Sequence, residues 1–224
     1  MAHEASCDEL SHALTMAPPP FGAIGQYRIL PITVESPNHG SFELVSGTED
    51  PIASPFGWHD TNGAAGAEFT YTRGNNVHAF ADRNWDYTSD FNVDGGANLI
   101  FDFPFNSETE PSANVNTAVT NLFYWNNLMH DLLFRYGLDE AAGAFQENNY
   151  TNLGADQDYV EAHAQFGDSN TTSCGAEANN DVECINNADF SHSPDGFNGR
   201  MRMFTWNLDN GSKYLDIIEP IDLA

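Results

Sequence analysis

Short runs of alternating apolar and polar residues predict several β-strands along the chain. The run "YRILPITVES" alternates from Tyr27 and is broken at Pro31, which cannot donate to a strand ladder. Similar runs are "SFELVSG", "LIFDFPF", "DYVEAHAQF" and "RMRMFTW", together with Glu68–Thr72 and Asn76–Ala81. Turn-forming residues separate these runs, so we expect short strands joined by irregular loops.

One long helix is predicted in "TNLFYWNNLMHDLLFRYG". We expect it to begin near Asn116 or Thr117, which can cap a helix, and to end at Gly137, a common residue after a helix. Apolar residues occupy nearly its whole circumference, which predicts burial inside a larger body. These residues are Val119, Leu122, Phe123, Trp125, Leu128, Met129, Leu132, Leu133, Phe134 and Tyr136.

Polar residues at the centre of this helix raise the question of a catalytic or metal site. They are Asn126, Asn127, His130 and Asp131. Neighbours at i and i+1 point about 100° apart on a helix, so His130 and Asp131 cannot act together on one ligand. We therefore expect these residues to tie the helix to adjacent strands by hydrogen bonds, in preference to a catalytic role.

The charge balance limits the partners of the chain. Only 7 Lys and Arg residues face 33 Asp and Glu residues, for a formal net charge of -26. Such a surface repels nucleic acid and anionic membranes, so we expect neither as a partner. No apolar run reaches the ~18–20 residues that span a bilayer. The first twenty residues lack the pattern of a signal peptide, so an export signal is expected to be removed already or to lie outside this sequence.

Two of the three cysteines bracket a short polar loop, "CGAEANNDVEC". A loop of this length is readily closed by a disulfide, so we expect a Cys174–Cys184 bond and an oxidising, extracytoplasmic setting. Two free surface thiols are the alternative. Cys7 has no evident partner in the sequence.

The segment "DRNWDYTSDFNVDGG" contains a candidate calcium site. Asp82, Asn84 and Asp86 alternate in the D-x-N-x-D order that opens many calcium loops, and Ca²⁺ prefers six to eight hard oxygen ligands. The full EF-hand pattern is absent, because its glycine position holds Tyr87 and its final bidentate Glu is missing. A solvated acidic loop is the alternative.

No complete catalytic motif is present. A zinc-protease helix needs two histidines at i and i+4 with a Glu beside the first, and none of the 8 histidines has this spacing. The sequence also lacks a G-x-S-x-G nucleophile elbow, a G-x-G-x-x-G loop and a P-loop.

Four segments resemble successive blocks of the fungalysin family of secreted zinc metallopeptidases. They are "ASPFGWHDTNG", "TRGNNVHAF", "AVTNLFYWNNLMHDLLFRYGLDEAAGAFQ" and "NNADFSHSPDGFNGRMRMFTW". The likeness extends from about Tyr27 to Trp206 and is closer to bacterial than to fungal members. It implies a thermolysin-like enzyme of two lobes that cleaves internal peptide bonds of proteins outside the cell. The implied fold class is α+β, a β-rich N-terminal lobe with one long buried helix.

The resemblance also divides the chain and its chemistry. Residues 1–20, which end in "APPP", are expected to form a flexible arm. The resemblance implies the N-terminal lobe at 21–206, and the segment 207–224 is expected to be a connector towards a C-terminal catalytic lobe. In that family an H-E-x-x-H helix and a later Glu bind zinc, and the first Glu activates the metal-bound water. This sequence lacks that motif, so we expect zinc only in the full-length enzyme and no catalysis by this chain alone.

One functional segment of the family has a counterpart here. In thermolysin-like enzymes an edge strand carries an Asn-Ala pair that holds the substrate backbone extended, and "NNADF" resembles that segment. Asn187 would then contact a protein or peptide substrate through its side-chain amide and Ala188 through its backbone groups. An ordinary Asn-rich turn is the alternative for this segment.

The alternative function is not enzymatic. The chain would then be a non-catalytic extracellular module, stabilised by calcium, that uses this lobe for binding or assembly.

Overall fold

The computed structural model describes residues 24–37, 39–168 and 187–206 as a β-rich fold with one long helix. The described strands are β1 (Gln26–Ile29), β2 (Glu43–Ser46), β3 (Val77–Ala81), β4 (Ile100–Phe101), β5 (Val160–Ala164), β6 (Ala188–Ser191) and β7 (Arg200–Met203). The helical segments are η1 (Pro111–Asn114), α2 (Val115–Arg135) and η2 (Glu140–Ala142). The predicted α+β class is confirmed.

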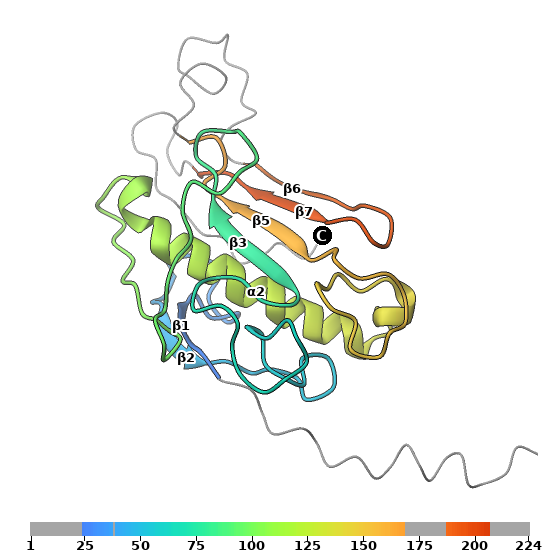
Figure 1. Ribbon diagram of the computed structural model, residues 1–224. Coiled ribbons are helices and arrows are strands. Elements are labelled where there is room, and N and C mark those ends of the chain that lie inside the picture. Colours follow the sequence, from blue (N-terminus) through green and yellow to red (C-terminus); the bar gives the residue numbers. More distant parts are fainter. Residues whose placement is uncertain (1–23, 38, 169–186, 207–224) are drawn as a thin grey trace, which may run out of the picture.

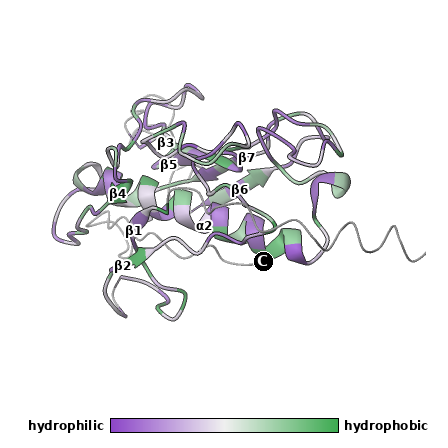
Figure 2. Ribbon diagram, turned by 60° about the horizontal axis from the view of Figure 1, so that its bottom comes forward, coloured by the Kyte–Doolittle hydropathy of each residue, from purple (hydrophilic) through white to green (hydrophobic). Residues whose placement is uncertain are grey.

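The strands form two sheets on opposite sides of α2 (Figures 1 and 2). The smaller sheet has the order β2-β1-β4, and the larger has the order β3-β5-β7-β6. In the larger sheet β3, β5 and β7 run parallel, and β6 is antiparallel to β7. The helix packs against β1 on one side and against β3 and β5 on the other. This position between two sheets explains why its sequence is apolar on nearly every side.

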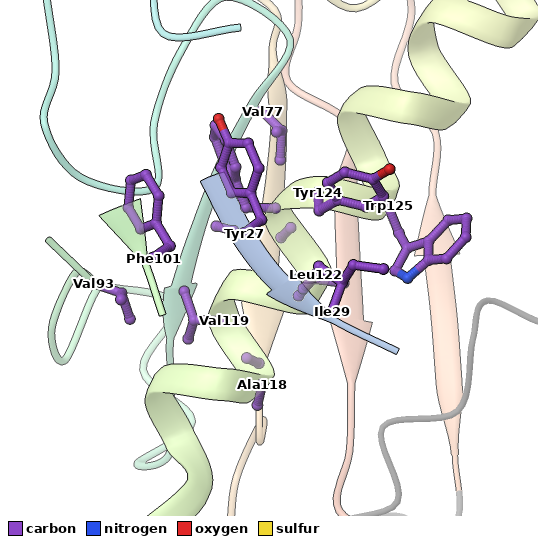
Figure 3. Close-up of a cluster of buried hydrophobic side chains, with 14 of the residues drawn as sticks. Tyr27, Ile29, Val77, Val93, Phe101, Ala118, Val119, Leu122, Tyr124 and Trp125 are labelled. Carbon is purple, nitrogen blue, oxygen red and sulfur yellow. The ribbon is translucent and has the colours of Figure 1, made fainter. Parts of the chain in front are cut away.

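Aromatic side chains from distant parts of the chain form the core beside α2 (Figure 3). Tyr27 of β1 and Phe101 of β4 stack with ring centroids 5.2 Å apart, and both are fully buried. Trp58 and Phe123 pack against Tyr27. Truncating one such ring to alanine typically costs about 3–5 kcal/mol, so this cluster fixes how the small sheet, the helix and the loop at Trp58 meet.

The helix begins slightly earlier than the sequence predicts. The short helix η1 leads directly into α2, and Asn114 occupies the N-cap position without capping through its side chain. The amide of Asn114 instead accepts from the N–H of Asn106 and donates to its C=O, both at 2.9 Å. A start at Asn116 or Thr117 is therefore wrong by a few residues, because the turn of η1 continues smoothly into the α-helix.

The end of the helix is as predicted. Gly137 has φ +104°, in the left-handed region that favours glycine. Its N–H donates to Phe134 O at 3.1 Å, and the N–H of Leu138 donates to Leu133 O at 3.0 Å. These two bonds form a Schellman motif, which satisfies carbonyls that the helix leaves open.

The last turns of α2 are more exposed than predicted. Leu132 and Leu133 keep 46% and 41% of their surface exposed, and Tyr136 keeps 84%. The expectation of burial along the whole helix is therefore wrong at this end, because no described element covers that side. Within the described residues, no helix has both the length and the apolar character needed to cross a membrane.

The strand predictions hold best where both neighbours of a strand are in place. The run at Asn76–Ala81 becomes β3, which pairs with β5 over its whole length. A strand at Glu68–Thr72 is wrong. There the chain makes only an isolated bridge from Tyr71 to Asp94, and Glu68 turns its carboxylate back to the N–H of Thr61. A turn closed by local hydrogen bonds therefore replaces the predicted strand.

Every arginine that the structure describes is paired with a carboxylate. The pairs are Arg28–Asp102, Arg73–Glu147, Arg83–Asp168, Arg135–Asp50, Arg200–Glu161 and Arg202–Asp189. Partly exposed pairs of this kind each contribute about 0–1 kcal/mol. Their larger consequence is that these basic groups are already committed, so the remaining carboxylates have no described arginine to neutralise them.

Candidate functional site

The strand β6 forms an edge of the larger sheet. It pairs with β7 on one side, in the register Ala188 to Met203 and Asp189 to Arg202, and no other described strand pairs with its second side. In an antiparallel pair, successive residues bond alternately to the partner strand and to the outside. The N–H of Phe204 donates to Asn187 O at 3.1 Å, so the backbone groups of Ala188 point to the open edge.

The Asn-Ala pair lies in this open position. Both residues are exposed, and the N–H of Ala188 donates to the side-chain oxygen of Asn187 at 2.9 Å. That bond is intramolecular and local, so an incoming backbone carbonyl can take its place. Residues Ala188–Ser191 form the edge strand that the resemblance implies, and substrate contact by Asn187 and Ala188 stays a prediction.

An ion pair fixes β6 against β7 on the sheet face turned away from α2. Asp189 accepts from Arg202 at 2.7 Å, and this carboxylate raises the pKa of the guanidinium. Arg202 also donates to the hydroxyl of Tyr87 at 3.2 Å and lies over the ring of Phe166. These contacts hold the edge strand in register.

The three residues of the predicted calcium loop come together beside His163 of β5. Asp82 is fully buried, and its Oδ2 lies 2.8 Å from Nδ1 of the equally buried His163. Its Oδ1 accepts from the N–H of Asp86 at 3.2 Å. Asp86 in turn accepts from Asn84 at 3.0 Å and from the N–H and the hydroxyl of Thr88. The hydroxyl and the N–H of Thr88 hold the pKa of Asp86 below its usual value.

In this arrangement the carboxylate oxygens of Asp82 and Asp86 all have protein partners. A bound ion would have to displace several of these bonds, so calcium in this loop stays a prediction.

The described residues do not fit a zinc site. Among them, no group of three or more His, Cys, Asp or Glu side chains is arranged to hold a metal ion. His163 is engaged with Asp82, and His130 lies 3.1 Å from the neighbouring Asp131. Zinc chemistry is therefore not assigned to this part of the chain.

The cysteine predictions cannot be placed in this fold. Cys7, Cys174 and Cys184 lie outside the described residues, so the Cys174–Cys184 bond stays a prediction.

Asp131 is a hydrogen-bonding centre of the helix. Its Oδ1 accepts from the Ser54 hydroxyl at 2.6 Å. Its Oδ2 accepts from the Trp58 indole N–H at 2.8 Å and from the N–H of Asp50 at 3.0 Å. The predicted structural role is confirmed, although the partners lie in the loop at residues 50–58 and not in a strand.

The asparagines at the helix centre have the same kind of role. Asn127 accepts from Asn76, just before β3, at 3.1 Å and donates to Phe123 O at 2.9 Å. Asn126 donates to Leu122 O within the helix at 2.8 Å and to Met201 Sδ of β7 at 3.5 Å. These bonds leave both amides engaged inside the fold.

His59 is a buried polar residue that periodicity does not reveal. Its Nδ1 lies 3.0 Å from Arg73 O, which can only accept, so Nδ1 carries the proton. Its Nε2 lies 2.9 Å from the Tyr27 hydroxyl and therefore accepts from it. Burial lowers the pKa of His59 to about 4, so the ring is neutral at pH 7. Stacked against Phe101 and Phe123, it serves packing.

The fold defines an α+β lobe with an unpaired strand edge at β6 among the described residues, and an edge of this kind is one to which extended peptides can add. The chain belongs to the fungalysin metallopeptidase family (M36), whose sequence profile matches residues 26–217. This confirms the family that the sequence blocks indicate.

Several fungal proteins are similar to this chain. An extracellular metalloproteinase of Pyrenophora tritici-repentis is 36% identical over 192 residues, which cover 84% of this chain and 26% of the relative. Extracellular metalloproteinase MEP of Leptosphaeria maculans is 34% identical over 198 residues, covering 86% and 28%. Extracellular metalloproteinase 2 of Trichophyton tonsurans is 32% identical over 202 residues, covering 87% and 28%.

The chain thus spans about a quarter of the length of these relatives. Their names agree with the extracellular setting predicted from the sequence. The expected closer likeness to bacterial members stays a prediction.

Proposed function

We propose that this chain is the substrate-binding lobe of a secreted zinc metalloendopeptidase that hydrolyses peptide bonds in proteins. The observation that carries the proposal is the open edge of β6, where the backbone of Ala188 faces away from β7. A substrate that adds to this edge is held extended by main-chain hydrogen bonds, whatever its sequence. This mode suits an endopeptidase, because one scissile bond must be positioned in many different proteins.

The side chain of Asn187 assists this binding. In the described structure its Oδ1 accepts the N–H of Ala188. When a substrate carbonyl takes over that N–H, the amide of Asn187 is released to donate to, and accept from, the substrate backbone. Asn187 and Ala188 would thus act as one unit at the edge.

The zinc ligands and the general base are supplied by the remainder of the full-length enzyme. The surface of this lobe supports such a partner, because α2 meets the larger sheet at β3 and β5, and Phe190 of β6 keeps 45% of its surface exposed. Leu132, Leu133 and Tyr136 extend the exposed apolar surface at the end of α2. A C-terminal catalytic lobe would cover apolar surface of this kind, and the chain alone would be inert.

A non-catalytic binding module would use the same edge of β6. The gathering of Asp82, Asn84 and Asp86 beside His163 is the observation that keeps this second function open, since a calcium ion there would stabilise the lobe without any second half.

Peptide binding by the 224-residue chain tests the proposed edge. We expect an unstructured casein peptide to bind the wild-type chain in calorimetric titration. Binding should be lost in Ala188→Pro, which removes the exposed N–H, and retained in Ala188→Val, which keeps that N–H and suits a strand. Equal binding by all three chains would exclude β6 as the site.

A casein digest with and without chelator tests the expected inertness. No cleavage should occur with the chain alone. Chelator-sensitive cleavage would contradict the proposal that residues outside this chain supply the zinc chemistry. Peptide binding at β6, together with a full reading frame that encodes no protease, would favour the binding module.

A further inference from the structure

The turn after Trp58 contains a fully buried carboxylate with one unsatisfied oxygen. Asp60 has no exposed surface, and its Oδ1 accepts from the N–H of Gly63 at 2.9 Å and from the Tyr150 hydroxyl at 2.6 Å. Its Oδ2 is buried and has no hydrogen-bond partner among residues 24–37, 39–168 and 187–206. A buried charged oxygen without a partner is costly, so a further group is needed there.

A second carboxylate lies in the same turn. Glu68 accepts from the N–H of Thr61 at 2.7 Å and from the side-chain amide of Asn62. Burial, with the charge of Glu68 adding to it, raises the pKa of Asp60. The two negative groups therefore sit within range of each other's charge.

No described arginine offsets this pair of carboxylates. Each of the six described arginines pairs elsewhere, and the nearest of them along the chain, Arg73, pairs with Glu147. Tyr150, the side-chain neighbour of Asp60, has its own pKa raised by burial and by the charge of Asp60. The turn thus concentrates negative charge, and no described arginine would compete with a cation for these carboxylates.

The ligand spacing of the turn suits a hard divalent cation. Asp60, Asn62 and Glu68 stand at the first, third and ninth positions of "DTNGAAGAE", and Gly63 (φ +74°) permits the tight bend between them. Carboxylate, amide and main-chain oxygens are the ligands of Ca²⁺, and water completes its six to eight positions. Two carboxylates would balance its charge.

We propose that the turn at residues 60–68 binds a calcium ion through Asp60 Oδ2 and the Glu68 carboxylate, with the amide oxygen of Asn62 as a third ligand. This site, here called the Asp60 turn, is separate from the predicted loop at Asp82. It adds a structural ion that clamps the loop carrying Trp58 and His59 to Tyr150. The proposal is independent of any peptidase activity.

Terbium emission tests this assignment directly. Tb³⁺ replaces Ca²⁺ at oxygen sites, and the Tyr150 hydroxyl, 2.6 Å from Asp60, lies close enough to sensitise its emission. After EDTA treatment and dialysis at pH 7.5, we expect the 224-residue chain to show tyrosine-sensitised emission that Ca²⁺ displaces. Glu68→Gln should weaken binding about 10-fold or more, since it removes one charged ligand. Glu68 is used because Asp60 variants can fail to fold.

Glu35→Gln is the matched control, because it makes the same change at a carboxylate outside both loops, whose side chain keeps 85% of its surface exposed. It should leave the emission and the Ca²⁺ affinity unchanged. A melt adds a second readout: saturating Ca²⁺ should raise the Tm of the wild type and of Glu35→Gln by about 5 °C, and that of Glu68→Gln by far less. Absence of emission, or the same response in Glu68→Gln as in the wild type, would overturn the proposal.

Discussion

At the scale of single residues, buried carboxylates divide into satisfied and unsatisfied groups. Asp131 accepts from Ser54, Trp58 and the backbone of Asp50, so its charge is stabilised by donors. Glu49 is only 8% exposed, and its Oε1 has no partner in the part of the chain that the structure describes. Burial, together with the charge of Asp131, raises the pKa of Glu49 to about 7. Burial of a carboxylate with one unpartnered oxygen thus favours the protonated form of Glu49.

This difference predicts a pH dependence that belongs to Glu49. Its pKa is about 7 in the fold and 4.5 in the reference state, so the folded chain holds the proton more tightly. The favourable contribution is complete below pH 4.5 and is lost as the pH rises through 7, for a change of about 3 kcal/mol at most. Glu49→Gln removes this dependence.

Urea unfolding of both chains at pH 5 and pH 8 measures the effect. The free energy of unfolding of Glu49→Gln, taken relative to wild type, should be higher at pH 8 than at pH 5. A difference that is the same at both pH values would show that Glu49 does not titrate in this window.

At the scale of elements, sequence patterns predict what a single segment determines by itself. The apolar stripe of α2 and its end at Gly137 follow from helical spacing and from a local backbone requirement. The strand β6 does not follow from alternation, because Ala188 and Phe190 are both exposed at the edge. Only the likeness to family blocks indicates it. At Glu68, alternation predicts a strand where side-chain bonds close a turn instead.

The C-terminus of α2 offers a test at this scale. Gly137→Ala places a side chain at φ +104°, so we expect the free energy of unfolding to fall by about 1 kcal/mol. Tyr136→Ala, a truncation at the adjacent and 84% exposed C-cap, is the matched control and should change stability by less than half as much. Denaturant melts measure both. Full stability in Gly137→Ala would mean that the helix end relaxes without cost.

The candidate sites show the same limit of sequence reasoning. Asn187 and Ala188 are found by family likeness, and their exposure to the open edge depends on pairing with β7, 15 residues away in the register Ala188 to Met203. The sequence "DTNGAAGAE" of the Asp60 turn predicts a turn but not an ion site. The burial of Asp60 depends on the fold, which brings Tyr150 to it from a distant loop.

At the scale of the whole molecule, charge dominates. The formal net charge is -26, and the described arginines are all engaged in ion pairs. The excess carboxylates therefore repel one another over the surface. Such self-repulsion destabilises a compact state and is weakened by dissolved ions.

This repulsion predicts stabilisation by dilute salt. Raising NaCl from 0.01 to 0.1 M shortens the Debye length from about 30 to about 10 Å, so we expect the Tm to rise by several degrees. EDTA in both buffers keeps bound calcium from contributing. An unchanged or lower Tm over this range would mean that the carboxylates are too far apart, or too well protonated, to matter.

The bond between Asn187 Oδ1 and the N–H of Ala188 has a consequence for self-association. An exposed strand edge is a template on which a second copy can pair and begin to aggregate. Here the edge strand is only four residues long, the N–H of Ala188 is already occupied, and two approaching copies carry charge of the same sign. The open edge of β6 is therefore poorly suited to pairing with the same edge of a second copy of the chain.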